Sequence, residues 1–246
     1  MDQANEDRAT ERAIGAVTGG AVLDASDIDE LLQKVVLLAR HTVGGAHSVS
    51  ISVPDNGGYR TSNSTADEAL LIDEAQYEGD DGPCLRALRS ARQVQVRVGA
   101  NGMRSPEFEE RAIAAGVTVV LSTPLIRGDG EPVGALNIYG HRDREFDEPE
   151  RRTAGIIGEH AAILVENALA LESATRLNDQ LRHAVASREI IGEAKGIIME
   201  RQTCTRDEAF DVLRRASQRE NRKLRDVAEE LVLRVEARRS ESRTEP

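Results

Sequence analysis

A stretch of roughly 50 residues without an internal proline, from Pro149 to about Met199, constrains the fold of this chain most strongly. As a single helix it would extend about 75 Å, at about 1.5 Å per residue. Apolar residues recur along it close to a heptad spacing, at Ile157, Leu164, Leu171, Ala174, Leu181 and Val185. Asn178 falls on the same seam, where a polar residue can fix the register of two helices. Because a small domain cannot bury so long and narrow a stripe, we predict a parallel homodimer joined along this helix.

The last quarter of the sequence divides into three short helices. The first carries an apolar stripe at a spacing of three to four residues. Thr205 then begins a capping box with Glu208, in which each side chain satisfies the backbone N–H of the other residue. The polar residues 217–222 separate the second helix from a third, which begins near Lys223. The three stripes can bury one another, so we predict a compact three-helix bundle with Phe210 in its core.

The same region is basic, whereas the rest of the chain is acidic. Residues 182–239 hold 14 Lys and Arg against 11 Asp and Glu, and the rest of the chain holds 18 against 32. This asymmetry indicates a small module that faces a polyanion, attached to an acidic body. Phosphates need cations, and loop bases need hydrogen-bonding groups such as an amide. The candidate residues for contact with such a polyanion are Lys195, Arg201, Arg214, Arg215, Asn221, Arg222, Lys223 and Arg225.

Five motifs of this region occur in the order and spacing of a known family. They are Ala194-Lys195-Gly196-Ile197, Thr205-x-x-Glu208-Ala209-Phe210, Leu213-Arg214-Arg215-Ala216-Ser217, Asn221-Arg222-Lys223-Leu224 and Asp226-Val227-Ala228. The region closely resembles the ANTAR domain, an RNA-binding module of bacterial antitermination regulators. The resemblance implies binding to paired hairpins with short loops in nascent mRNA, which stabilises an antiterminator and prevents the overlapping terminator from forming.

The acidic body alternates helical and strand-like patterns. An apolar stripe from Ile28 to Ala39 is typical of a helix. Strands are expected at 47–53, 59–63, 94–98, 117–124 and 132–139, and further helices at 66–76 and 108–115. Turns rich in glycine, at 54–58 and 128–130, join neighbouring strands as hairpins. This order predicts an α+β fold, with helices at the ends and on one face of an antiparallel sheet.

Four pieces of the acidic body carry a second resemblance. They are Ala46-x-Ser48-Val49-Ser50-Ile51, Gln76-Tyr77-Glu78-x-x-Asp81-Gly82-Pro83-Cys84-Leu85, Ala115-Gly116-Val117 and the hairpin from Pro124 to Tyr139. The body resembles a GAF domain of the actinobacterial type found in front of ANTAR modules. Because GAF folds commonly cup a small molecule, the resemblance implies a sensor with a small-molecule effector. No cofactor is predicted.

Cys84 is the candidate for ligand contact or redox chemistry in this domain. It follows Gly82-Pro83 at a turn that opens a helix, and a helix N-terminus lowers the pKa of a thiol. The alternative is a small buried residue. Some GAF relatives reduce free methionine sulfoxide through several cysteines, but the second cysteine here, Cys204, lies in the basic region. We therefore expect no catalytic residue, with a GAF-type thiol oxidoreductase as a lesser alternative. The histidines show no ligand spacing, so no metal site is expected.

These observations give a domain plan. It comprises a flexible N-terminal segment (1–26), a GAF-like sensor domain (27–165), a coiled-coil linker helix (166–188), a three-helix ANTAR module (189–236) and a disordered tail (237–246). No apolar run approaches the roughly 20 residues that cross a bilayer, and the first residues are acidic rather than signal-like. We expect a cytoplasmic protein that does not enter a membrane.

A DNA-binding regulator is the main alternative to the RNA-binding protein. A basic three-helix module can imitate a helix-turn-helix domain, whose second helix leads through a tight turn into a recognition helix. The polar residues 217–222 are a rather long link for such a turn. The length of the link and the ANTAR motifs favour RNA.

Overall fold

The computed structural model describes residues 25–100 and 105–241 of the chain. The chain forms two compact units, Met1–Glu172 and Ser173–Pro246. The expected flexible segment 1–26 lies outside the described residues except for its last two positions. The expected tail 237–246 lies outside them from residue 242 onward, and residues 237–241 belong to a helix.

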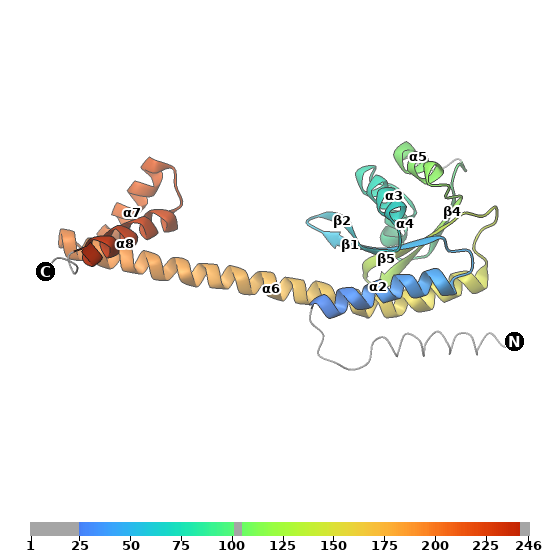
Figure 1. Cartoon of the computed structure of the whole chain (residues 1–246), viewed down its shortest axis with the longest axis horizontal. Coiled ribbons are helices and arrows are strands. Elements are labelled where there is room, and N and C mark those ends of the chain that lie inside the picture. The colour runs from blue at the N-terminus through green and yellow to red at the C-terminus, as the bar shows by residue number, and fades with distance from the viewer. Residues whose placement is uncertain (1–24, 101–104, 242–246) are drawn as a thin grey trace. The chain divides into compact units, whose positions relative to one another are not determined.

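A five-stranded antiparallel sheet forms the centre of the first unit, in the order β2-β1-β5-β4-β3 (Figure 1). Its strands are β1 (Ser48–Asp55), β2 (Gly58–Ser64), β3 (Val94–Arg97), β4 (Val119–Ile126) and β5 (Pro132–Gly140). Between β1 and β2, Asn56 and Gly57 have φ values of 44° and 87°, and a tight two-residue hairpin of type I′ requires positive φ at both positions. The predicted antiparallel sheet and its central β4–β5 hairpin are confirmed.

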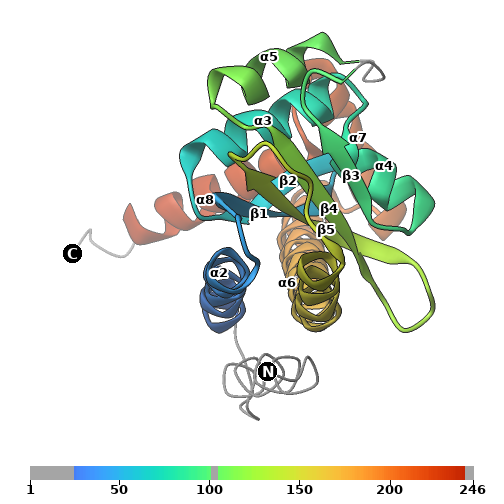
Figure 2. The same cartoon turned by 90° about the vertical axis from the view of Figure 1, so that its right-hand side faces the viewer.

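Helices cover both faces of this sheet (Figure 2). Helices α2 (Ala25–Thr42) and α6 (Glu148–Gln202) pack on one face, and α3 (Asp67–Glu78), α4 (Pro83–Ser90) and α5 (Pro106–Ala114) pack on the other. The expectation of helices on one face was therefore wrong. The alternation of serine with valine and isoleucine along β1 is typical of a strand with one solvated face, but Ser48, Ser50 and Ser52 are fully buried.

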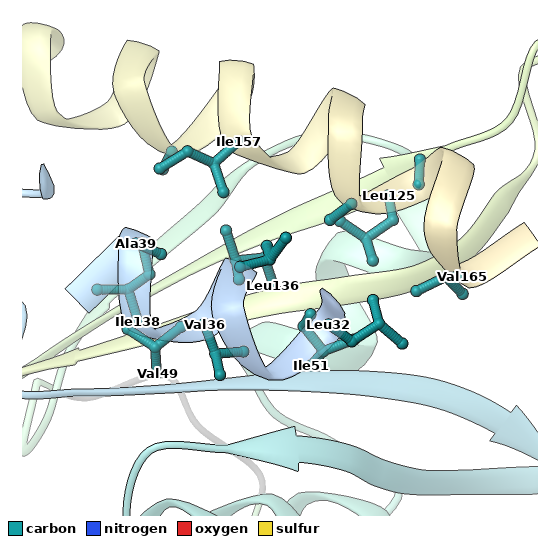
Figure 3. Packing of buried hydrophobic residues seen from close by; sticks show 14 of the residues in the cluster. Leu32, Val36, Ala39, Val49, Ile51, Leu125, Leu136, Ile138, Ile157 and Val165 are labelled. Carbon is teal, nitrogen blue, oxygen red and sulfur yellow. The ribbon is translucent and has the colours of Figure 1, made fainter. Parts of the chain in front are cut away.

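The larger apolar core lies between the sheet and the pair α2 and α6. Figure 3 shows Leu32 and Val36 of α2, Ile157 of α6, and Ile51 and Leu136 of the sheet meeting there. Each of these side chains is at least 98% buried. Full burial of one such side chain stabilises the fold by about 1.5–3 kcal/mol relative to exposure. The apolar alternation of β1 and β5 therefore fixes which face of the sheet receives α2 and α6.

Helix α6 is 55 residues long and has two kinds of surface. Its first part packs on the sheet, and Ile157 and Leu164, which the sequence suggested as part of a dimer seam, are buried in the core of their own domain. From Glu172 to Ala186 every side chain is exposed. One window of α6, with a mean hydropathy of 1.3, is long and apolar enough to span a membrane by length and composition alone, and 39% of it is buried inside the protein. The core helix of a water-soluble protein passes the same test.

The second unit is a three-helix bundle, as predicted. The end of α6 packs with α7 (Arg206–Glu220) and α8 (Leu224–Glu241). The capping box is present, because Thr205 N–H donates to Glu208 Oε2 over 2.8 Å and Glu208 N–H donates to Thr205 Oγ1 over 3.4 Å. The predicted polar link was too long. Helix α7 continues to Glu220, and the link to α8 is only residues 221–223.

Candidate nucleic-acid interface

Three alanines sit where the helices of the bundle meet. Ala194 on α6, Ala209 on α7 and Ala228 on α8 are fully buried, and Ile198 and Leu213 fill the core beside them. The separation of packed helices depends on the side chains at the contact, so small residues allow close approach. The polar residues between these positions therefore lie on the outer surface of the packed bundle.

Lys195 and Phe210 lie together on the surface of the bundle. The Nζ atom of Lys195 lies over the Phe210 ring, 5.6 Å from its centroid, within the range of a cation–π contact. Phe210 is 38% exposed, so its predicted place in the core is wrong. Ala209 and Leu213 take the inward positions of α7, and Phe210 is turned from Ala209 by about 100° around the helix.

Arg214 and Arg215 are both exposed on α7. Arg214 forms an ion pair with Asp211 over 2.8 Å. Arg215 forms no ion pair with any residue in the described part of the chain. Because residues four apart share a helix face, Arg214 lies on the side of Phe210, whereas Arg215 faces about 100° away.

The turn between α7 and α8 brings four predicted residues together. Asn221 adopts the left-handed conformation, with φ of 51°, and its backbone N–H bonds to carbonyls at the end of α7. The Arg222 guanidinium pairs with Glu230 and lies 3.5 Å from Glu220. Ionised Glu230 is the main reason that the pKa of Arg222 is raised. The remaining two are Lys223, which is exposed, and Arg225, which is partly buried. Neither forms an ion pair among the described residues.

Arg201 lies apart from this turn. It lines a groove of about 250 Å³ between the three helices, together with apolar residues and the charged side chains of Arg234 and Glu230. Arg201 follows Lys195 by six residues, which places it about 120° away around α6. The structure therefore places Lys195 against Phe210, on whose side of α7 Arg214 also lies, and it gathers four predicted residues at the turn. Arg201 and Arg215 face other directions.

Cys84 is completely buried at the start of α4. Its N–H donates to Gln76 Oε1 over 2.9 Å, and its Sγ donates to Ser52 Oγ over 3.3 Å. Burial, with a contribution from the charge of Asp73, raises the pKa of the thiol to about 12. The expected lowering of this pKa by the helix N-terminus is therefore reversed, and Cys84 is a neutral thiol near pH 7. Across the described residues, no group of three His, Cys, Asp or Glu side chains is placed to hold a metal ion.

A buried polar network beside Cys84 was missed by the sequence reasoning. Asp73 of α3 accepts hydrogen bonds from the Tyr139 hydroxyl, from Asn137 Nδ2 over 3.1 Å and from Thr61 Oγ1 over 2.9 Å. Burial raises the pKa of Asp73 to about 6, and the hydrogen bonds from its neighbours keep it from rising further. The signal was the row of polar residues at alternate positions of β1 and β5, which face α3 rather than solvent.

Family models assign both units. A model of the GAF domain matches residues 25–166, more than half of the chain. The chain belongs to the GAF domain family. A model of the ANTAR domain matches residues 179–232, so the architecture is GAF–ANTAR. All eight predicted contact residues fall within the ANTAR match. No curated protein matches the chain.

Solved structures share the fold of the GAF domain. The GAF domain of a phosphoenolpyruvate-protein phosphotransferase (ptsP) from Coxiella burnetii is 17% identical, with a TM-score of 0.52, covering 70% of this chain and 98% of that chain. The GAF domain of the Acinetobacter phosphoenolpyruvate-protein phosphotransferase is 14% identical, with a TM-score of 0.50, covering 70% and 99%. The reduced form of fRMsr from Staphylococcus aureus is also 14% identical, with a TM-score of 0.50, covering 65% and 95%. At these identities the likeness concerns the fold alone.

Proposed function

We propose that this protein is a transcription antiterminator that binds paired hairpins in nascent mRNA through its ANTAR module and is regulated through its GAF domain. The observation that carries the proposal is the ANTAR match over residues 179–232, which contains every cation of the predicted interface. A GAF domain joined to an ANTAR domain is a regulatory architecture rather than an enzymatic one. Binding to transcripts places the protein in the cytoplasm.

The arrangement of the module fits contacts to a folded RNA. Lys195 and Arg214 supply positive charge on one face, and Lys223 and Arg225 supply it at the turn between α7 and α8. Asn221 beside them offers an amide to base edges, although its backbone is committed to the end of α7. Phosphate contacts give affinity and register, whereas base contacts give sequence preference.

Two hairpins call for two modules, and the exposed part of α6 offers a way to join them. Leu181 and Val185 are more than half exposed on this helix, with Asn178 one turn before Leu181. We place the homodimer seam here, over a shorter stretch than the sequence first indicated. Two linked modules on neighbouring hairpins gain effective concentration, so the avidity of the dimer exceeds the affinity of one contact by orders of magnitude.

Regulation is proposed to enter through the GAF domain. Its fold is the one in which a small-molecule effector would be held, and α6 belongs both to its core and to the bundle. A ligand that shifts the packing of α6 on the sheet would act on the same helix that carries Lys195. Such a ligand can change the affinity for RNA only by as much as its own affinity differs between the two conformational states of the protein.

The test is binding of the full-length protein to a labelled RNA with two short-loop hairpins, measured against increasing salt. We expect tight binding that weakens steeply with salt, a loss of affinity for R214A, and no loss for R92A, a matched change of an exposed arginine in the GAF domain. Equal affinity for the RNA and for a duplex DNA of the same charge would contradict the proposal.

The three-residue link between α7 and α8 supports one alternative. Helix-turn-helix modules join their two helices by a turn of three to four residues, so the length of this link no longer argues against duplex DNA. A DNA-binding regulator would place α8 in the major groove. Preference for the duplex over the twin hairpin in the same experiment would establish it.

A further inference from the structure

The outer face of the bundle carries an aromatic ring that its core does not use. Within residues 189–235, which form the described surface of the three-helix bundle, the exposed large apolar side chains are Phe210 and Leu233, and Phe210 is the aromatic one. The buried positions of α7 are filled by Ala209 and Leu213. An apolar ring held at the surface is available to a partner.

The surroundings of Phe210 are those of a surface that meets a polyanion. Lys195 Nζ lies over the ring, and Arg214 is one turn further along the same side of α7. Asp211, the residue after Phe210, is paired with Arg214. An aromatic ring flanked by cations suits a nucleotide, which has a flat base to stack and a phosphate to neutralise.

We infer that Phe210 is a stacking platform for an unpaired base of the RNA loop, with Lys195 as the contact to the phosphate of that nucleotide. The inference rests on the proposed function and names the subsite at which a base is held. In the free protein the ammonium group lies over the ring. On binding, the base takes its place there, and the flexible lysine stem carries the ammonium to the phosphate.

This assignment separates two kinds of contact that a binding experiment can distinguish. Stacking is insensitive to salt and needs an aromatic ring, whereas the lysine contact releases counterions and needs only a charge. F210L keeps an apolar side chain of similar size and removes the ring. F210W keeps a ring. K195Q keeps the length of the side chain and removes its charge.

The experiment measures affinity of the full-length protein and these variants for the twin-hairpin RNA over a range of salt concentrations. We expect F210L to weaken binding by at least about fivefold with an unchanged salt slope, and F210W to bind as the wild type does. K195Q should reduce the salt slope by about one for each module engaged. Equal affinity of F210L and wild type would overturn the inference, while failure of the wild type itself to bind would instead overturn the proposed function.

A second readout does not depend on how well F210L folds. The fluorescent base 2-aminopurine is placed in turn at each loop position of the RNA and mixed with the wild-type protein. We expect one position to be quenched on binding by the wild type and by F210W, because a base stacked on an aromatic ring loses fluorescence. Absence of such a position for the wild type, at concentrations where the RNA is bound, would also overturn the inference.

Discussion

Asp73 is a fully buried carboxyl group, and its hydrogen bonds come from the neutral side chains of Tyr139, Asn137, Thr61 and Gln76. Its pKa is raised from 3.8 to about 6, so the folded protein binds its proton more tightly than the unfolded chain does. The contribution of Asp73 to the free energy of unfolding should therefore be greatest below about pH 4 and fall as the pH rises to about 6, by on the order of 3 kcal/mol. Denaturant unfolding measured between pH 4 and pH 8 checks this direction.

D73N is the matched variant for that measurement. An asparagine can keep its oxygen toward Tyr139 and Asn137, and the Thr61 hydroxyl can turn to accept from the new amide. The other titratable groups of the network, Tyr77, Tyr139 and Cys84, have raised pKa values and stay neutral over this range. The difference in unfolding free energy between wild type and D73N should change between about pH 4 and 6 and level off above. Parallel curves would show that Asp73 does not titrate there.

Cys84 provides a second prediction at the scale of a residue. Its thiol is buried and its pKa is raised to about 12, whereas Cys204 is partly exposed. Because the thiolate is the reactive species, native protein should expose one readily reacting thiol to an aromatic disulfide reagent, and denatured protein two. C204A should abolish the fast reaction, and C84A should leave it intact. Rapid labelling of Cys84 in the native state would restore the redox interpretation.

At the scale of a single element, a network of hydrogen bonds and ion pairs holds the start of α6. Asp147 and Glu150 form a reciprocal cap, with Glu150 N–H donating to Asp147 Oδ1 over 3.1 Å and Asp147 N–H donating to Glu150 Oε2 over 2.8 Å. Arg142 and Arg144 both pair with Glu150. Burial raises the pKa of Glu150, but the hydrogen bonds from the two arginines outweigh it and lower the pKa to about 2.

E150Q should therefore destabilise the GAF domain at pH 7. The side chains of Glu150 and Arg142 are only 11% and 16% exposed, and removal of one partner from such a pair costs about 3 kcal/mol. E148Q is the control, because Glu148 is 76% exposed and its pair with Arg151 contributes less than about 1 kcal/mol. A carboxyl group with a lowered pKa stabilises the fold above about pH 4.5 and loses that effect toward pH 2. Thermal unfolding of the two variants at both pH values should show the difference shrinking in acid.

The helices and strands could be predicted from the sequence largely because the apolar residues of each segment follow one spacing, either that of a helix or that of a strand. The alternation in β1 and the stripe of α2 identified the faces that meet in the main core, and the capping box identified the start of α7. The polar face of the sheet was misread, because a buried hydrogen-bonded serine and a solvated one look alike in sequence. The end of α7 was misread for a related reason, since its last turn is polar on every side. It is held by backbone bonds and by the Ser217 hydroxyl, which donates to the Arg222 carbonyl.

The candidate site was less predictable than the fold. Phe210 was expected in the core because most aromatic residues on an amphipathic helix are buried. In the structure Ala209 and Leu213 take the inward positions of α7, which leaves Phe210 on the surface. The engagement of Arg222 by Glu230 depends on how α8 folds back against the turn, eight residues away in the chain. Sequence spacing names the charges of an interface. It does not tell which of them are already neutralised.

At the scale of the whole molecule, α6 is the one described element that both units share, and the apolar side chains in its middle are exposed. From Glu172 to Ala186 its side chains are exposed, yet Leu177, Leu181 and Val185 lie there at intervals of four residues. Because a helix in a protein owes most of its stability to the packing of an apolar face, these exposed apolar residues indicate a partner helix. A second copy aligned in parallel would bury these residues and place Asn178 against Asn178, which fixes the register.

The double variant L181K/V185K tests this arrangement, because two lysines on a closed seam face two others across it. We expect wild-type protein to be a dimer by sedimentation and the variant to be a monomer, with unchanged thermal stability of the GAF domain, whose core ends before this stretch. The monomer should bind a single hairpin as the wild type does but lose at least about a hundredfold in affinity for the twin hairpin. Q180K/H183K, which adds two lysines at exposed positions of the same helix outside the seam, controls for a general effect of substitution on α6. A wild-type protein that stays monomeric at high concentration would contradict the proposed dimer interface along α6. Binding to the twin hairpin would then have to come from a single module.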